Sequence, residues 1–274
     1  MDTSQSFFLT GCASGIGRYL CDQLVTRGYF VYATDVNFTA LEEAATKGNW
    51  SKTRTRLAQL DVRDHEAWNR TFADAINAFE KIDVCMNIAG ILKANWVHEV
   101  PIDEINAQVD INVKGVIFGT TVAAAHMVER KQGHIMNIAS MASLAPIPGL
   151  SVYSATKYAV RGYSMAAAAE LRQHGVFVTA LCPDGVDTPL LDVPSENDAA
   201  SIIWSGSRLL TVEEIGRIVM DHILPNKPIL VALPLSRALL ARAADLFPGW
   251  AGKLLPFLQK RGREHRFRDR NHQH

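Results

Sequence analysis

Near its N-terminus the chain reads Ser6-Phe7-Phe8-Leu9-Thr10-Gly11-Cys12-Ala13-Ser14-Gly15-Ile16-Gly17. The apolar run before Gly11 predicts a buried strand, and apolar residues then recur at helical spacing as far as Leu24. A strand, a glycine loop and a helix in this order form a turn that binds phosphate at the helix N-terminus. Gly11 permits the tight turn, Gly15 lets a pyrophosphate approach the backbone, and Gly17 allows close helix packing. The stretch therefore predicts an α/β fold that binds a dinucleotide.

A second predicted strand, residues 29–34, ends at Asp35. A carboxylate at this point can accept hydrogen bonds from the diol of an adenosine ribose, and it would repel a 2′-phosphate. The alternative interpretation is a surface Asp at the end of a strand. We favour the ribose role because the glycine loop stands at the required place upstream.

Tyr153 and Lys157 are a candidate acid/base pair in the second half of the chain. On a helix, their spacing puts the two side chains one turn apart on the same face. A phenol titrates near about 10, and a fixed ammonium beside it favours the phenolate and lowers that pKa. The same spacing occurs on ordinary helices, so the assignment depends on the dinucleotide motif upstream.

Together these motifs resemble the classical short-chain dehydrogenase/reductase family. The resemblance covers about residues 6–233 and begins with the family's Thr-Gly-x-x-x-Gly-x-Gly loop at Thr10. It continues through Asn87-Ile88-Ala89-Gly90, where the family pattern is Asn-Asn-Ala-Gly, and ends with the segment from Pro183 to Thr188. It implies a single doubly wound, Rossmann-type parallel sheet with helices on both faces, over residues 1–235.

The resemblance also implies four catalytic residues, Asn112, Ser140, Tyr153 and Lys157. Tyr153 would exchange the proton of the substrate hydroxyl, Lys157 would lower its pKa and bind the nicotinamide ribose, and Ser140 would hydrogen-bond the substrate oxygen. Asn112 would distort its helix and hold a water connected to Lys157; an Asn inside a helix needs some such reason. Ser143 is a nearby alternative to Ser140, but the family spacing to Tyr153 favours Ser140 and leaves Ser143 as a candidate for the pocket lining.

The predicted cofactor is NAD, with NADP disfavoured by Asp35, and we expect no metal site. The residues that the motifs and the resemblance assign to the cofactor are Gly11, Ser14, Gly15, Ile16, Gly17, Asp35, Asp61, Val62, Asn87, Ala89, Gly90, Tyr153, Lys157, Pro183, Val186 and Thr188.

The segment at about residues 189–210 would close over the substrate. Its apolar residues, with others near Ser140, predict an apolar pocket. The candidate substrate residues are Ser140, Tyr153, Asp184, Leu190 and Trp204. Asp184 replaces the usual Gly of the family, and three consequences stay open: a narrower nicotinamide pocket, a carboxylate at the substrate mouth, or no functional effect.

Residues 236–274 extend beyond the family core. Their pattern predicts an amphipathic helix that ends near Pro248, a second apolar stretch at residues 250–258 and a basic end. Three interpretations stay open: a lid or subunit-contact arm, attachment to an anionic membrane surface, and a disordered tail without a role. Nucleic-acid binding is not expected, because the basic run lacks interleaved stacking aromatics.

Composition is that of an ordinary globular protein. The 274 residues are 48% hydrophobic and 20% charged, with a formal net charge of zero. The balance of charge gives no global attraction to nucleic acid. The four cysteines form no Cys-x-x-Cys pair and fit a reducing cytoplasm. No apolar run is expected to approach the length of a membrane span.

The sequence thus predicts a cytoplasmic, NAD-dependent oxidoreductase that interconverts an apolar secondary alcohol and its ketone, as a homodimer or homotetramer. One alternative is an NADPH-dependent carbonyl or 3-oxoacyl reductase, which Asp35 argues against. The other is a catalytically silent dinucleotide sensor or scaffold, which the presence of all four catalytic residues argues against. The substrate, the direction of the reaction and the choice between dimer and tetramer stay open.

Overall fold

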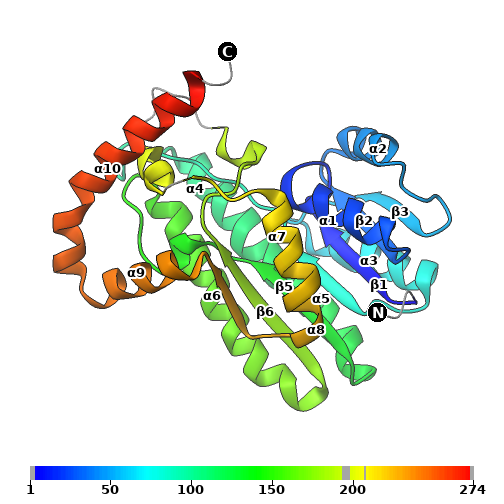
Figure 1. The fold of residues 1–274 in the computed structure, drawn as a ribbon. Helices are drawn as coiled ribbons and strands as arrows, with labels where there is room; N and C mark the ends of the chain where they lie inside the picture. The colour runs from blue at the N-terminus through cyan, green and yellow to red at the C-terminus, as the bar shows by residue number, and fades with distance from the viewer. Residues whose placement is uncertain (1–3, 193–197, 207, 272–274) are drawn as a thin grey trace.

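The computed structural model of the chain describes residues 4–192, 198–206 and 208–271 (Figure 1). Within these residues the strands are β1 (Ser6–Thr10), β2 (Phe30–Asp35), β3 (Thr55–Gln59), β4 (Val84–Asn87), β5 (Gly133–Ile138), β6 (Val176–Pro183) and β7 (Leu230–Leu233). All pair in parallel, in the order β3-β2-β1-β4-β5-β6-β7. The order reverses between β1 and β4, so the sheet is doubly wound, and the predicted fold class is confirmed.

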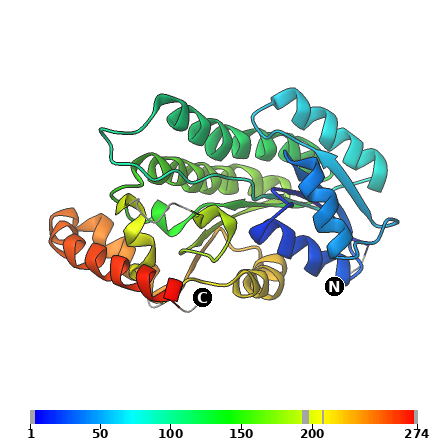
Figure 2. The same cartoon turned by 90° about the horizontal axis from the view of Figure 1, so that it is seen from above.

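Helices cover both faces of the sheet (Figure 2). Because successive side chains of a strand point to opposite faces, Phe7 and Leu9 of β1 lie in one core and Phe8 lies in the other. Helices α1 (Gly15–Thr26), α2 (Phe38–Lys47) and α7 (Val212–Ile218) contribute to the first core. Helices α3 (His65–Phe79), α5 (Gly115–Glu129) and α6 (Ser151–Leu171) contribute to the second. Burial on both faces explains why the central strands are apolar throughout.

The remaining helices lie along the same chain path. Helix α4 (Ile102–Val109) is joined to α5 by a π-helical turn, Asp110–Lys114. After α7 come a second π-helical turn, Val219–Ile223, and the short α8 (Leu224–Asn226). Beyond β7, α9 (Leu235–Leu246) and α10 (Pro248–Asn271) form an arm on one side of the molecule (Figure 1). The predicted break at Pro248 therefore separates two helices.

The structure corrects one expectation about apolar runs. The helical stretch Ile102–Glu129 is long and apolar enough, by length and composition, to cross a membrane. Ala123 and Met127 are fully buried against the sheet. A helix that covers a sheet passes the same test, so this property does not by itself indicate a membrane span.

His134 of β5 is a buried titratable group away from the pocket. Its side chain is hydrogen-bonded to the hydroxyl of Thr179 at 2.8 Å, and its Nδ1 has no partner among the described residues. Burial is the main cause that lowers the pKa of His134 to about 3, with Lys227 adding to the effect. The folded protein therefore holds this imidazole neutral above about pH 3.

This neutral histidine predicts a loss of stability in mild acid. In the unfolded chain His134 takes up a proton at about pH 6.5. Between that pH and about pH 3 the unfolded state binds more protons than the folded state, so stability falls as pH falls. At pH 5 this proton uptake lowers the free energy of unfolding by about 2 kcal/mol. We expect His134→Gln to lose about 2 kcal/mol less than wild type between pH 7 and pH 5, measured as the free energy of unfolding in urea. Equal losses in the two proteins would contradict the prediction.

Candidate active site

The carboxyl ends of the central strands open onto a pocket of about 580 Å³. In a doubly wound sheet this edge, at the point where the strand order reverses, is where ligands bind. Of the residues predicted to meet the cofactor, all except Asn87 line the pocket. The fold thus brings together glycines from the first turn, carboxylates at the end of β2 and after β3, and the candidate acid/base pair of α6.

The glycine loop forms a cradle that side chains would fill. Gly11 and Gly15 have φ angles of +71° and +53°, in the left-handed region that favours glycine. A Cβ on Gly17 would lie 2.0 Å from the carbonyl oxygen of Gly11. Among the described residues no side chain caps α1, whose N-cap is Ser14. The N–H groups of its first turn, at the pocket wall, therefore suit a pyrophosphate.

Asp35 is fixed at the edge of this cradle. Its Oδ2 accepts a hydrogen bond from the Ala13 N–H and its Oδ1 accepts one from the Asn37 N–H, each at 2.9 Å. Each carboxylate oxygen can accept more than one hydrogen bond, so both keep capacity for the two hydroxyls of a ribose. The geometry fits the predicted ribose contact.

Thr10 links the end of β1 to the segment after β4, and Asn87 links β4 to β5. Thr10 Oγ1 accepts hydrogen bonds from the N–H groups of Ile88 and Ala89, at 3.0 and 3.1 Å. Asn87 lies beneath the lining and donates from Nδ2 to Asn137 Oδ1 at 2.8 Å. Asn87, which the sequence assigned to the cofactor, is a buried link between β4 and β5 and lies outside the lining. No structural role of Thr10 is predicted from the sequence, although its position at the end of β1 could have indicated one.

Asn112 lies in the π turn between α4 and α5, so the predicted helix distortion is present. The side chain is fully buried. Its Oδ1 accepts from the Ile91 N–H at 2.8 Å, while its Nδ2 donates to the Ile91 carbonyl at 2.9 Å and to Thr156 Oγ1 at 3.2 Å. The amide therefore clamps the loop after β4 to α6, beside Lys157. Sequence reasoning did not identify Thr156 as its partner.

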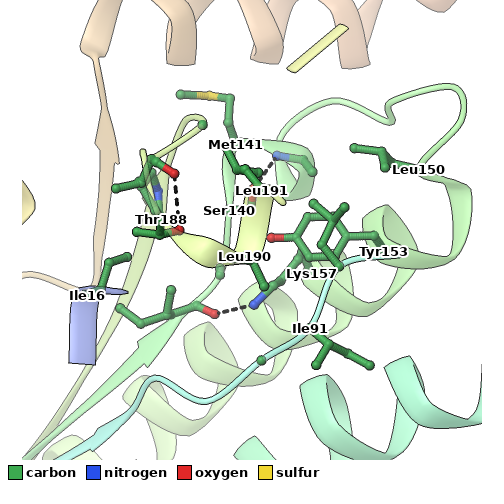
Figure 3. A pocket seen from close by; sticks show the side chains of 18 of the residues that line it. Ile16, Ile91, Ser140, Met141, Leu150, Tyr153, Lys157, Thr188, Leu190 and Leu191 are labelled. Carbon is green, nitrogen blue, oxygen red and sulfur yellow. Dashed lines mark hydrogen bonds between the residues drawn. The ribbon is translucent and has the colours of Figure 1, made fainter. Parts of the chain in front are cut away.

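Ser140, Tyr153 and Lys157 converge on one side of the pocket (Figure 3). Ser140 Oγ accepts from the Ala142 N–H at 3.1 Å, which leaves its own proton to donate. Lys157 Nζ donates to the Ile138 carbonyl at 2.9 Å and lies 5.6 Å from the centre of the Tyr153 ring. Ser143 is fully buried and donates to the Ser140 carbonyl at 2.5 Å, so it supports Ser140 and does not line the pocket.

Burial dominates the electrostatics of this pair. It raises the pKa of Tyr153 to about 12, although hydrogen bonding with Ser140 acts in the opposite direction. It lowers the pKa of Lys157 to about 8, against a smaller opposing effect of Cys182. The sequence predicted that Lys157 would lower the pKa of Tyr153. The structure instead shows a raised pKa: burial is the dominant cause, the opposing cause is the hydrogen bond with Ser140, and the phenol is the prevailing form at neutral pH.

The substrate side is only partly as predicted. Ser140, Tyr153, Asp184 and Leu190 line the pocket. Trp204 is partly buried and packs in a cluster with Leu150 and Tyr153, beside the lining. Trp204 belongs to the 3-10 helix Asp198–Ser205, and its neighbours Ile202 and Ile203 face the pocket instead. Residues 193–197 and 207 of the predicted substrate segment lie outside the described residues.

The extension after residue 235, for which the sequence left a lid open as one interpretation, supplies one wall of the pocket. Arg237, Leu240, Ala241 and Ala244 of α9 and Leu258 of α10 line the pocket. Arg237 forms an ion pair with Asp184, the residue that replaces the usual Gly. The helical period of residues 235–246 located α9, but no pattern in the sequence indicates what a helix packs against. Asp184 therefore has a structural partner, and it does not stand alone at the substrate mouth.

Comparison with known proteins shows that this chain is similar to dehydrogenases. Residues 5–199 match the family model described as short chain dehydrogenase. The 2-(R)-hydroxypropyl-CoM dehydrogenase of Xanthobacter autotrophicus is 32% identical over 226 residues, covering 79% of this chain and 90% of that enzyme. The 2-dehydro-3-deoxy-L-rhamnonate dehydrogenase (NAD(+)) of a Sphingomonas species is 35% identical over 67% of this chain and 73% of its own length. The solved structure of ElxO with NADP bound superposes with a TM-score of 0.75 at 25% identity, covering 84% of this chain and 96% of that one.

Proposed function

Because this chain belongs to the short chain dehydrogenase family, we propose that it interconverts an apolar secondary alcohol and its ketone with NAD as the cofactor. The observation that carries the proposal is the convergence of Ser140, Tyr153 and Lys157 on an apolar pocket that continues into the glycine cradle. A bound nicotinamide cofactor supplies the hydride acceptor or donor. Relatives named as dehydrogenases support the reaction class.

Each of the three side chains has a distinct task in this proposal. Tyr153 accepts the hydroxyl proton in the alcohol-to-ketone direction and donates it in reverse. Ser140 donates a hydrogen bond to the substrate oxygen, because its Oγ already accepts from the Ala142 N–H. Lys157, held by the Ile138 carbonyl, stabilises the phenolate when protonated. Since burial raises the pKa of Tyr153 to about 12, oxidation depends on positive charge that offsets this burial.

The charges around the pocket support an uncharged substrate. The charged residues of the lining are Asp35, Asp61, Arg63, Lys157, Asp184 and Arg237. Arg63 donates from Nε to both carboxylate oxygens of Asp61, at 2.9 and 3.0 Å, and Arg237 is paired with Asp184. Asp35 and Lys157 serve the cofactor. No unpaired cation on the described lining is thus left to bind a carboxylate or phosphate substrate.

The proposed NAD preference rests on Asp35, and replacing this residue tests it. Asp35→Ala removes acceptors for the ribose diol and the repulsion of a 2′-phosphate. A hydrogen bond to a charged group contributes about 1.5–3 kcal/mol, so we expect NAD affinity to fall at least about tenfold and NADP affinity to rise. Fluorescence titration of both reduced cofactors measures the two dissociation constants. Glu43→Ala, which removes an exposed carboxylate on the neighbouring α2, is the matched control and should change neither.

A panel of secondary alcohols and ketones, assayed with NAD and with NADP, tests the function itself. Turnover of apolar members with NAD is the expected result. A clear preference for NADP would favour the carbonyl reductase alternative, to which the NADP-bound structural relative lends some support. Tight cofactor binding without turnover of any member would favour a silent dinucleotide sensor and contradict the proposal.

A further inference from the structure

The C-terminal extension, defined here as α9 and α10, closes one side of the pocket. Four residues of α9 and Leu258 of α10 face the cavity. The family match ends at residue 199, so this wall lies beyond the part of the chain that the family model describes. In Figure 1 the arm lies next to the segment after β6, which carries the 3-10 helix Asp198–Ser205. The extension and this helix therefore lie next to each other at the substrate end of the pocket.

Three contacts hold α9 against the body of the protein. Ala238 is buried with Met141 and Cys182, next to the catalytic serine. Tyr158 of α6 donates its hydroxyl proton to Asp245 Oδ1 at 2.7 Å. Arg237 Nε pairs with Asp184 Oδ2, where the two side chains are 31% and 15% exposed. Helix α9 is thus fixed both to the helix that carries Tyr153 and to the loop after β6.

Helix α10 is fixed to the opposite wall. A Cβ on Gly262 would lie 2.0 Å from the carbonyl oxygen of Ser201, so the two backbones are in direct contact. The adjacent Ile202 and Ile203 line the pocket. Only glycine permits so close an approach. The contact therefore sets the distance between α10 and the substrate-side helix.

The Asp184–Arg237 pair connects this wall to the reacting end of the pocket. Asp184 directly follows Pro183, which the motif places at the nicotinamide, and its N–H donates to the Leu233 carbonyl at 2.9 Å. Arg237 Nη2 also donates to Ser205 Oγ at 3.4 Å, at the end of the 3-10 helix. One guanidinium thus joins α9, the loop after β6 and the substrate-side helix. Because Asp184 neutralises it, the cation does not serve as an anchor for an anionic substrate.

We propose that the C-terminal extension is the wall of an apolar substrate subsite, which selects uncharged substrates with a long apolar group. In this proposal the Asp184–Arg237 pair is a positioning device that keeps α9 against the nicotinamide end. The inference rests on the proposed function and assigns it a specificity-determining element. Leu240, Ala241, Ala244 and Leu258 contact the apolar group, at a distance from the reacting oxygen.

Filling the subsite tests the proposal. Ala244→Trp places an indole in the cavity, while Leu239→Trp enlarges a side chain that is 61% exposed on the same helix. Both variants and wild type are assayed with NAD on 2-alkanols from 2-butanol to 2-decanol. One methylene in an apolar pocket changes kcat/KM by about 10- to 200-fold. We therefore expect Ala244→Trp to lose at least about tenfold in kcat/KM for 2-decanol and little for 2-butanol. Leu239→Trp should keep the wild-type ratio.

An unchanged ratio of 2-decanol to 2-butanol in Ala244→Trp would overturn the inference while leaving the proposed oxidoreductase intact. No turnover of any alcohol by wild type would count against the proposed function instead. In that event the binding of 2-decanone, followed by thermal shift in the two variants, still tests the subsite: equal shifts overturn it.

The ion pair is tested by a single and a double variant. Arg237→Gln leaves the Asp184 carboxylate buried without its partner, whereas Arg237→Gln with Asp184→Asn removes both charges. We expect the single variant to raise KM for 2-decanol about tenfold or more with a smaller change in kcat, and the double variant to recover most of the loss. A kcat loss that is equal for short and long alcohols, without recovery in the double variant, would show a general structural role and overturn the positioning role.

Discussion

Tyr153→Phe is expected to reduce kcat by about 10²–10⁴-fold in both directions of the reaction. The substitution removes only the phenolic oxygen, the group that exchanges a proton with the substrate in the proposed mechanism. The ring stays in its buried cluster with Leu150, so the pocket keeps its shape. Of the residues assigned to the cofactor, only Tyr153 loses a polar group, and the glycine cradle and Asp35 are untouched, so NAD affinity should remain within about threefold of wild type. Steady-state rates and cofactor titration measure the two quantities.

Tyr163→Phe provides the matched control on the same helix. Tyr163 belongs to α6 but does not line the pocket. Its variant should retain both turnover and cofactor binding. Substantial turnover by Tyr153→Phe would eliminate the proton-transfer role and point to another acid/base group.

Gly17→Ala is expected to cause the largest loss of cofactor binding, about 100-fold or more, together with a lower unfolding temperature. The new Cβ would lie 2.0 Å from the Gly11 carbonyl oxygen and 2.7 Å from its carbonyl carbon. Both are backbone atoms of the turn that would bind the pyrophosphate, so neither can rotate away as a side chain would. Helix α1 must therefore move from the loop, and its N-terminal N–H groups move with it.

Gly252→Ala separates this steric effect from the general effect of a methyl group in a helix. Gly252 lies in α10, and a Cβ there would meet no atom within 4 Å. The control should leave NAD affinity unchanged and slightly stabilise the protein, because alanine is the better helix former. Normal NAD binding by Gly17→Ala, measured by calorimetry, would contradict the steric argument.

Local patterns predicted most of the fold and much of the site. Gly11 and Asp35 stand at strand ends and Gly15 begins α1, where the chain direction and the period of apolar residues locate them without tertiary information. The four proposed catalytic residues came from motif spacing and resemblance, and the structure brings three of them to the pocket. Asn112 lies behind it, in the helix distortion that the family resemblance implied.

What the sequence could not predict depends on contacts between distant segments. Arg237 is one cation among several in a basic extension, and its partner Asp184 belongs to a loop before the substrate segment. Trp204 and Ile203 are adjacent, and only the packing of the 3-10 helix determines which of them faces the cavity. The pKa of Tyr153 likewise follows from burial, which the spacing to Lys157 does not report.

The π turn at Asp110–Lys114 has a consequence for how this site tolerates changes in chain length. A π turn contains one residue more than an α-helical turn, so it acts as a single-residue insertion between α4 and α5. Because the π turn takes up the extra residue locally, deleting one residue there would restore a regular helix and keep α4 and α5 nearly in phase, but it would move the residues of the turn from their positions. The Asn112 amide would then lose its register with Ile91 and Thr156. The shortened variant, with the more regular helix, would thus be inactive. The extra residue allows α5 to cover the sheet while Asn112 still bonds to Ile91 and Thr156.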